Sequence, residues 1–313
     1  MAAAGLTRDH IVWAYRILLD RDPESEAVIV PKLNGYQSTQ QLRADIVTSQ
    51  EYADKNPDFA RTNARTVIIK ELDAGPRLFI DLSDHFIGLP VVRGQYEQSE
   101  LEFVRRTLKP GDHALDVGAH IGFFAIQMAQ FVGTSGSVTA FEPLEENASL
   151  LERSIAENGF TDRLRLERAA VSRQSGETNL TFSTETLNSG GAFIVTGSIP
   201  HGHATRRIRV TALDDLPLPR PVAFIKMDVE GAEPLVLEGA TRLITADRPT
   251  FLTELHREQL ERVSGLTAAA FLQRVAALRY RAFRIENGAR GREVTAPPQE
   301  PVCSIALIAS ERA

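Results

Sequence analysis

The stretch HALDVGAHIGFFAIQMA, residues 113–129, decides the fold class of this chain. An apolar strand pattern runs into the acid Asp116, Gly118 and Gly122 follow, and an apolar helix pattern then begins. In open α/β sheets, ligands bind outside the carboxyl ends of strands, and glycines let the backbone approach a ligand closely. The order of strand, acid, glycine loop and helix therefore predicts a ligand site at this strand end.

The charge of the loop indicates which ligand it suits. Its spacing, D-x-G-x-x-x-G, differs from the G-x-G-x-x-G of dinucleotide loops, and a carboxylate is a poor neighbour for a pyrophosphate. A second acid, Glu142 in TAFEP, ends the next strand, where it can accept hydrogen bonds from both hydroxyls of a ribose. Together the two acids predict a nucleoside with a cationic tail, S-adenosylmethionine. The alternative is that Gly118 and Gly122 only permit tight strand–helix packing.

Strand and helix patterns alternate on the C-terminal side of this stretch. Strand patterns occur in SVTAFEP, LRLERAAVS, VAFIKMDVEG, PTFLTELH, RAFRIENG and VCSIALIA. Such alternation predicts an α/β domain with a mostly parallel sheet covered on both faces. Three further strand patterns, TVIIKEL, RLFIDLSD and HFIGLPVVRG, predict an antiparallel element in front of it.

Residues 1–60 have a different pattern. Apolar residues recur at helical spacing in DHIVWAYRILLDRDP, and STQQLRADIVTSQEYA begins with a Ser-Thr cap. We expect a helical module of three or four helices over residues 1–60, a polar linker, and the main domain over 66–313.

Composition excludes several classes of protein. The net charge of −6 leaves no chain-wide basic field for nucleic acid. The single cysteine, Cys303, cannot form an intrachain disulfide, and it lies in an apolar stretch typical of a core. No segment approaches the roughly 20 apolar residues of a membrane span, and MAAAGLTRDH lacks the features of a secretion signal. We therefore expect a cytoplasmic protein.

Two runs carry a resemblance to a known family. Residues 94–159, from GQYEQ to SIAENG, resemble a class I S-adenosylmethionine-dependent methyltransferase, and FIKMDVEGAEPLVLEGA followed by PTFLTELH resembles the FkbM family. The resemblance implies a Rossmann-like fold with a mostly parallel seven-stranded sheet, preceded here by a small all-α domain. It also implies O-methylation of hydroxyls on sugars, polyketides or other natural products.

The resemblance implies a set of site residues. The signature motif matches at Asp228, Glu230, Gly231 and Glu233. Ala170 stands where many methyltransferases have an acid near the adenine, which is a departure from the pattern. The expected cofactor residues are Tyr96, Glu97, Asp116, Gly118, Ala119, His120, Gly122, Glu142, Pro143, Asn147, Ala170 and Asp228.

Methyl transfer to a hydroxyl is helped by a base or a metal that removes the proton. The candidate catalytic residues lie where two strands end: Lys226, Asp228, Glu254 and His256. His256 and Asp228 are alternative bases, and Asp228, Glu230, Glu254 and His256 together suit a divalent cation such as magnesium. The competing interpretation is a buried network that holds the loops, with Lys226 paired to an acid.

The segment 183–207 is rich in Ser, Thr and Gly and interrupts the βα alternation, which is typical of a substrate lid or of a plain connection. Its His201 and His203 have the H-x-H spacing of a metal pair or belong to a solvated loop.

The N-terminal run YRILLDRDPESEAVIVPKLNGYQSTQQLRADIVTSQEY resembles a small helical domain of unknown function that accompanies bacterial surface-glycan enzymes. This favours a sugar or glycan intermediate as the acceptor, with residues 1–60 as a surface for a protein partner or for self-association. The alternatives are a polyketide or peptide acceptor and a non-catalytic scaffold. A nucleic-acid methyltransferase is a weaker alternative, because the acidic balance and the absence of an N/D-P-P-Y/F sequence disfavour it.

Overall fold

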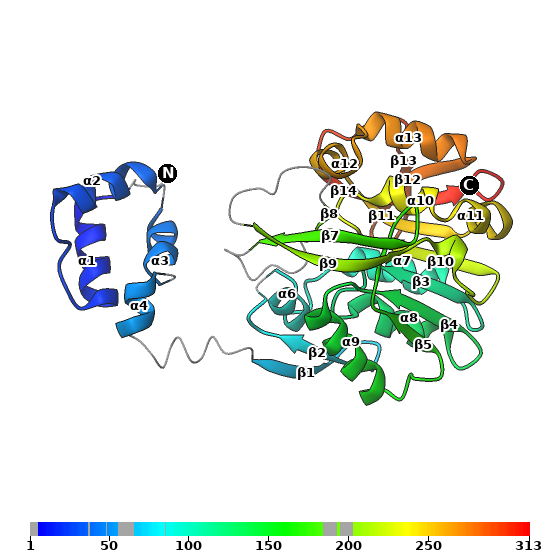
Figure 1. Cartoon of the computed structure of the whole chain (residues 1–313), viewed down its shortest axis with the longest axis horizontal. Helices are drawn as coiled ribbons and strands as arrows, with labels where there is room; N and C mark the ends of the chain where they lie inside the picture. The colour runs from blue at the N-terminus through cyan, green and yellow to red at the C-terminus, as the bar shows by residue number, and fades with distance from the viewer. Residues whose placement is uncertain are drawn as a thin grey trace. The chain divides into compact units, whose positions relative to one another are not determined.

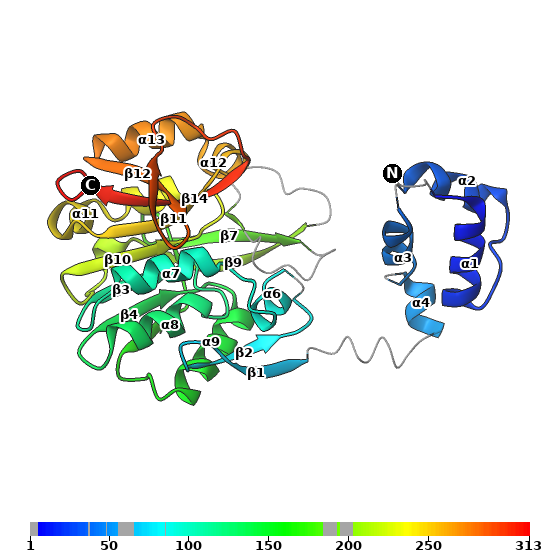
Figure 2. The same ribbon diagram turned by 180° about the vertical axis from the view of Figure 1, so that it is seen from behind.

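The computed structural model describes residues 6–36, 38–47, 49–55, 66–84, 86–183, 193–194 and 203–313. The chain divides into two compact units, Met1–Thr66 and Val67–Ala313 (Figures 1 and 2). Within the described ranges, no helix has both the length and the apolar character needed to cross a bilayer.

The first unit is helical. Its helices are α1 (Arg8–Leu19), α2 (Glu26–Gly35), α3 (Thr39–Val47) and α4 (Gln50–Lys55). Thr7 begins α1 by accepting a hydrogen bond from the His10 backbone N–H, as an N-cap residue does. The apolar residues of the helical pattern are buried together; they include Ile11, Tyr15, Leu19, Ile29, Leu42 and Ile46.

The second unit is built on an eight-stranded sheet with the order β13-β12-β14-β11-β10-β3-β4-β5. The strands are β3 (His113–Val117), β4 (Ser137–Phe141), β5 (Leu164–Glu167), β10 (Val222–Met227), β11 (Thr250–His256), β12 (Tyr280–Glu286), β13 (Ala289–Glu293) and β14 (Val302–Ala309). The first five run parallel, and β14 is antiparallel to both of its neighbours. The predicted α/β class is confirmed. The eighth strand, β13, exists because the chain turns back at Asn287 and Gly288 and pairs with β12.

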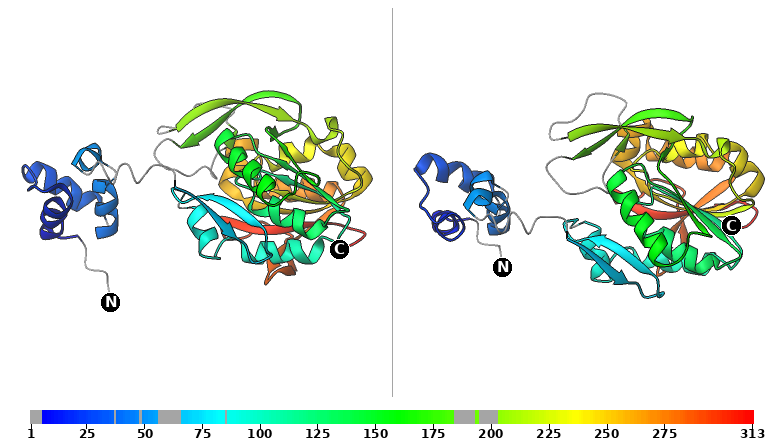
Figure 3. Two further views of the ribbon diagram at one scale, coloured as in Figure 1. Left: turned by 90° about the horizontal axis from the view of Figure 1, so that it is seen from below. Right: turned by 60° about the horizontal axis from the view of Figure 1, so that its bottom comes forward.

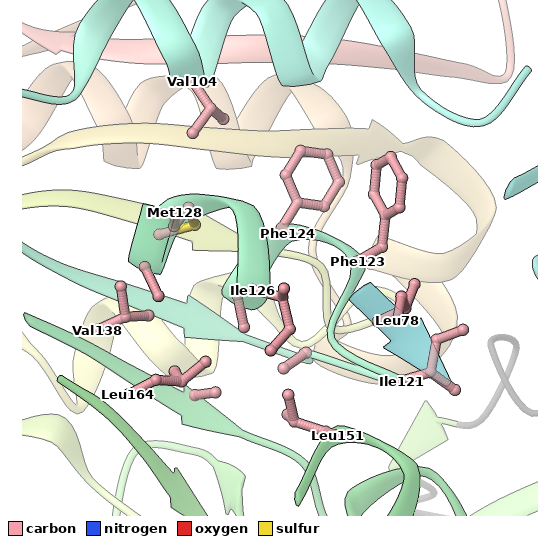
Figure 4. Close-up of a cluster of buried hydrophobic side chains, with 14 of the residues drawn as sticks. Leu78, Val104, Ile121, Phe123, Phe124, Ile126, Met128, Val138, Leu151 and Leu164 are labelled. Atoms are coloured by element: carbon pink, nitrogen blue, oxygen red, sulfur yellow. The ribbon is translucent and has the colours of Figure 1, made fainter. Parts of the chain in front are cut away.

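Helices cover both faces of this sheet. The apolar side chains of α7 (Gln98–Thr107), α8 (Phe123–Val132) and α9 (Glu145–Glu157) form one core with one face. Those of α10 (Glu233–Glu238), α11 (Thr241–Asp247), α12 (Arg257–Ser264) and α13 (Ala268–Ala277) form a second core with the other. Figure 4 shows Phe123, Phe124 and Met128 of α8 among Val104 of α7 and Leu151 of α9. A short helix, η1 (Leu213–Asp215), precedes β10.

The segment in front of the sheet is only partly as predicted. β1 (Val67–Glu71) and β2 (Arg77–Asp81) form the expected antiparallel pair. The strand predicted over HFIGLPVVRG is wrong, because these residues contain the helix α6 (Gly88–Val92). The Asp84 carboxylate accepts the backbone N–H of Phe86 and of Ile87, and this capping begins a helical turn where apolar composition alone favoured a strand.

A second, four-stranded sheet has the order β6-β9-β7-β8. Its strands are β6 (Ala170–Val171), β7 (Gly176–Ser183), β8 (Phe193–Ile194) and β9 (His203–Thr211). LRLERAAVS is therefore two strands of different sheets, β5 and β6. Figure 3 shows β7 and β9 as a long ribbon beside the main sheet, and Leu180 and Ile208 of this ribbon pack with Leu144 and Leu235. Most of the predicted lid, 183–207, lies outside the described residues.

Candidate functional site

The site is assembled where parallel strands end at one edge of the sheet. Asp116 on β3 is the register partner of Lys226 on β10, and Lys226 is the partner of Leu252 on β11. Register partners and alternate residues share a face, so Asp116, Lys226 and Glu254 project to the side that α7 and α8 cover. We call Asp116, Gly118, His120, Gly122 and Glu142 the β3–β4 end, and Lys226, Asp228, Glu230, Glu254 and His256 the β10–β11 end.

The glycine loop needs both of its glycines for packing. Gly118 has φ +83°, and a Cβ there would lie 1.9 Å from the Asp228 carbonyl oxygen. Gly122 has φ +94°, and its Cβ would lie 2.3 Å from Cδ1 of Leu151 on α9. The packing alternative therefore applies to both positions. The close approach of Gly118 to the Asp228 carbonyl also packs the loop against Asp228, and this contact joins the two ends of the site.

Glu142 is held by the backbone of the loop. The N–H of His120, at φ +52°, donates to Glu142 Oε2 over 2.9 Å, and the N–H of Leu144 donates to Oε1 over 2.8 Å. Burial raises the pKa of Glu142 to about 7, although these N–H groups and Asn147, buried in the first turn of α9, favour its charged form. A carboxylate has about four acceptor positions, so Glu142 keeps acceptor capacity for a ligand.

Asp116 is the least compensated group of the site. It is fully buried, and among the residues that the structure describes neither of its carboxylate oxygens has a hydrogen-bond partner. Burial raises its pKa to about 6, and the nearby charge of Lys226 limits the rise. A buried carboxylate without a partner is costly, so this position fits a ligand that brings a positive charge and hydrogen-bond donors.

Other predicted cofactor residues surround this end. The rings of Tyr96 and Phe123 pack edge to face, with 5.1 Å between their centroids. Burial raises the pKa of the Tyr96 hydroxyl well above its ordinary value. Ala119 donates its N–H to the Phe141 carbonyl, and Pro143 is half-buried beyond β4. Ala170 lies in β6, paired with Val210 of the second sheet.

The β10–β11 end is a group of carboxylates around one ammonium. Lys226 Nζ lies 3.0 Å from Asp228 Oδ2. Burial raises the pKa of Glu254 to about 8, and the charges of Asp228 and Glu97 add to the rise. Glu97 has φ +41° just before α7, and burial raises its pKa to about 7 against the effect of Lys226. The structure thus brings Glu97 together with the predicted catalytic residues.

The two glutamates of the signature motif differ in surroundings. Glu233 is buried at the start of α10, and its Oε1 accepts the N–H of Gly231 over 3.2 Å, so it holds the loop. Glu230, at φ +53°, accepts a hydrogen bond from Gln259 Nε2 over 3.1 Å. Burial raises the pKa of Glu230 to about 8 and of Glu233 to about 7.

His256 already uses one ring nitrogen. It is the N-cap residue of α12, where its Nδ1 accepts the Gln259 N–H over 3.3 Å. In the neutral ring the proton then sits on Nε2, so neither nitrogen is free to accept another. This argues against His256 as the base.

The divalent cation receives no support. Among the residues that the structure describes, no group of three or more His, Cys, Asp and Glu side chains could hold a metal ion. His201 and the side chain of His203 lie outside the described part of the structure.

Two residues that contribute to the site were not predicted from the sequence. Asp84 Oδ2 lies 3.7 Å from His120 Nε2, beside the glycine loop, and the ring of Phe124 lies 4.9 Å from Lys226 Nζ. The capping pattern of LSDHF could have revealed Asp84, whereas no local pattern indicates the contact of Phe124.

Comparison with known proteins decides the family. The model of the methyltransferase FkbM domain matches residues 116–285, more than half of the chain and all of the strand ends described above. The chain belongs to the FkbM methyltransferase family. None of the curated proteins compared with it matches.

Several solved structures are similar to this chain at low identity. The chain is similar to an FkbM methyltransferase from Methylobacillus flagellatus KT (15% identity, 95% of this chain and 58% of that one, TM-score 0.41). It is also similar to an S-adenosylmethionine-dependent O-methyltransferase from Thermotoga maritima (16%, 79% and 78%, TM-score 0.39). A third is an O-methyltransferase from Bacillus cereus in complex with S-adenosylhomocysteine (15%, 68% and 81%, TM-score 0.40). This FkbM-family chain thus spans 58% of the length of the Methylobacillus protein.

Proposed function

We propose that this FkbM-family protein is an S-adenosylmethionine-dependent O-methyltransferase whose acceptor is a hydroxyl of a sugar or glycan intermediate. One observation carries the proposal. At one edge of the sheet, the buried acids Asp116 and Glu142, which suit a nucleoside with a cationic tail, lie next to the carboxylates of the β10–β11 end, which suit the binding of a hydroxyl. The cofactor, when bound, supplies the methyl group as part of a sulfonium.

The β3–β4 end supports cofactor binding. Asp116 would pair with the ammonium group of the cofactor, which supplies the donors that its carboxylate lacks. Glu142 would accept the two ribose hydroxyls at the positions left by the His120 and Leu144 N–H groups. Tyr96 and Glu97 would close this side from the start of α7.

The β10–β11 end supports proton removal. Glu254 is the base that we favour, because a carboxyl with a pKa of about 8 is matched to accepting a hydroxyl proton near neutral pH. Its proton would come from the acceptor oxygen as that oxygen attacks the methyl carbon. Asp228, beside Glu254 and bonded to Lys226, would orient the hydroxyl.

A sugar acceptor is supported by the same carboxylates. Glu97, Asp228 and Glu254 offer acceptor oxygens to several neighbouring hydroxyls, as a polyol presents them. An apolar polyketide would leave the remaining acceptor positions of these carboxylates unfilled, at a cost in free energy.

The test has two stages. Calorimetric titration with S-adenosylhomocysteine needs no knowledge of the acceptor, and we expect micromolar binding. A labelled methyl donor is then offered with sugars, polyketides and peptides, with and without magnesium. Methylation of sugars without a magnesium requirement is the expected result. Methylation of apolar products only would overturn the proposal of a sugar acceptor. Absence of cofactor binding would favour the alternative that the protein is a non-catalytic scaffold.

A further inference from the structure

Lys226 lies in the middle of the site, and the proposed chemistry gives it no role of its own. The residue is only 6% exposed, and it neighbours two acids that belong to different ends. Asp116 is its register partner on β3, and Asp228 Oδ2 lies 3.0 Å from its Nζ. The ring of Phe124, on α8, faces the ammonium at 4.9 Å from the ring centroid.

The carboxylates that act on Lys226 lie on β3, directly after β10 and just before α7. Burial would lower the pKa of its ammonium, but Asp228, Asp116 and Glu97 together hold that pKa above its ordinary value. The group therefore stays protonated, and a protonated amine cannot act as a base.

Two more titratable groups face this ammonium. Glu254 on β11 is stabilised in its charged form by Lys226, while the charge of Lys226 disfavours protonation of His120 in the glycine loop. A single buried cation thus influences groups on both ends of the site.

We propose that Lys226 is a positioning residue that places its positive charge beside Asp116 at the cofactor end and holds Asp228 at the acceptor end, and so couples the two ends. The inference rests on the proposed function, because it takes Asp116 as the partner of the cofactor ammonium. Its geometric basis is that both carboxylate oxygens of Asp116 lack hydrogen-bond partners among the described residues, and that Lys226 is the cation beside it in the register.

The experiment measures the affinity for S-adenosylhomocysteine by calorimetry at several pH values from about 5.5 to 8.5. It compares the wild-type chain, Lys226→Met and Lys226→Arg, with the exposed Lys109→Met as a matched control for the loss of one lysine. Glu142 is present in all four proteins, and burial is the main cause of its raised pKa in the wild-type chain.

We expect wild-type affinity to weaken below about pH 6, where Asp116 takes up a proton. In Lys226→Met the pKa of Asp116 rises further, so the onset of weakening moves up by about one pH unit, which is about tenfold weaker binding in the acidic range. Lys226→Arg and Lys109→Met should keep the wild-type profile.

An unchanged pH profile in Lys226→Met would overturn the coupling while leaving the cofactor assignment intact. An equal loss of affinity at every pH would also overturn it, because that is the result of a merely structural role. No binding by the wild-type chain would overturn the proposed function and this inference together. If Lys226→Met does not fold, as judged by thermal unfolding, Lys226→Gln and the Asp116→Asn variant replace it. Asp116→Asn should remove the acidic weakening that is assigned to Asp116.

Discussion

The β3–β4 end of the site is built mainly from backbone geometry, whereas the β10–β11 end is built from side-chain charge. At the β3–β4 end, Gly118, His120 and Gly122 all have positive φ, and backbone N–H groups hold Glu142 in place. At the β10–β11 end, Asp228 and Glu254 are half-buried around one ammonium, and burial together with neighbouring carboxylates raises the pKa of Glu254.

The difference separates two tasks. Because the cofactor is always the same molecule, a rigid loop can bind it with little movement of the protein. Proton removal needs groups whose ionisation is adjustable, and adjacent carboxylates in a partly buried place provide that. The following predictions are designed to break this division or to sharpen it.

The largest effect should come from the backbone of the loop. In Gly118→Ala the new Cβ meets the Asp228 carbonyl at 1.9 Å in a left-handed backbone conformation, so we expect the free energy of unfolding to fall by about 3 kcal/mol or more. Gly265→Ala is the matched control, because its φ is +71° with no atom within 4 Å, and it should cost only about 1 kcal/mol. Urea denaturation measures both, and equal losses would contradict the packing role of Gly118.

The next effect concerns pH and the unliganded protein. Burial raises the folded-state pKa of Glu142 and of Glu233 to about 7, well above 4.5, so the folded chain keeps protons that the unfolded chain has released. The contribution of these two groups to the free energy of unfolding should therefore be complete below about pH 4.5. It should be lost as the pH rises through about 7. Each group contributes up to about 3 kcal/mol.

Urea unfolding between pH 5 and pH 8 checks this trend. Glu142→Gln, at the β3–β4 end, and Glu233→Gln, at the start of α10, should each flatten it. Carboxylates paired with arginine, such as Glu102, have a lowered pKa and act only at more acidic pH. Stability that rises with pH across this window would show that the buried acids are compensated.

A third prediction separates the candidate bases. Glu254→Gln should lower turnover of the identified acceptor by about 100-fold, with affinity for S-adenosylhomocysteine nearly unchanged. His256→Ala should lower turnover less, while losing about 1 kcal/mol of stability, because His256 caps α12. Steady-state kinetics on both variants decides the matter. A larger kinetic loss in His256→Ala would move the base to the histidine.

The fourth prediction tests the β3–β4 end directly. Glu142→Ala removes the acceptor for the ribose hydroxyls and should weaken binding of S-adenosylhomocysteine about tenfold. The exposed Glu145→Ala, three residues further along, serves as the control and should bind as the wild type does. Calorimetry that finds unchanged affinity in Glu142→Ala would remove Glu142 from the cofactor site.

The smallest effect should follow from removing the first unit. The fragment 66–313 contains the whole of the second compact unit, so its affinity for S-adenosylhomocysteine should stay within about twofold of the full chain. Aggregation of the fragment, seen by size-exclusion chromatography, would show that the two units depend on one another.

The sequence by itself determined the α/β class, the helical first unit and the strand ends at which Asp116, Glu142, Asp228 and Glu254 lie. These features follow from local patterns: apolar periodicity marks strands and helices, and an acid or a glycine directly after a strand marks the edge where ligands bind.

Only the tertiary structure decided how those residues meet. The helix α6, the strand β13 and the second sheet arise from capping by Asp84, from a turn at Asn287 and from pairing of segments distant in sequence. The register of β3 with β10 sets Lys226 beside Asp116, and the fold of α7 brings Glu97 to them. The role of a lysine or a carboxylate depends on burial and on neighbouring charge, and both are properties of the packed molecule.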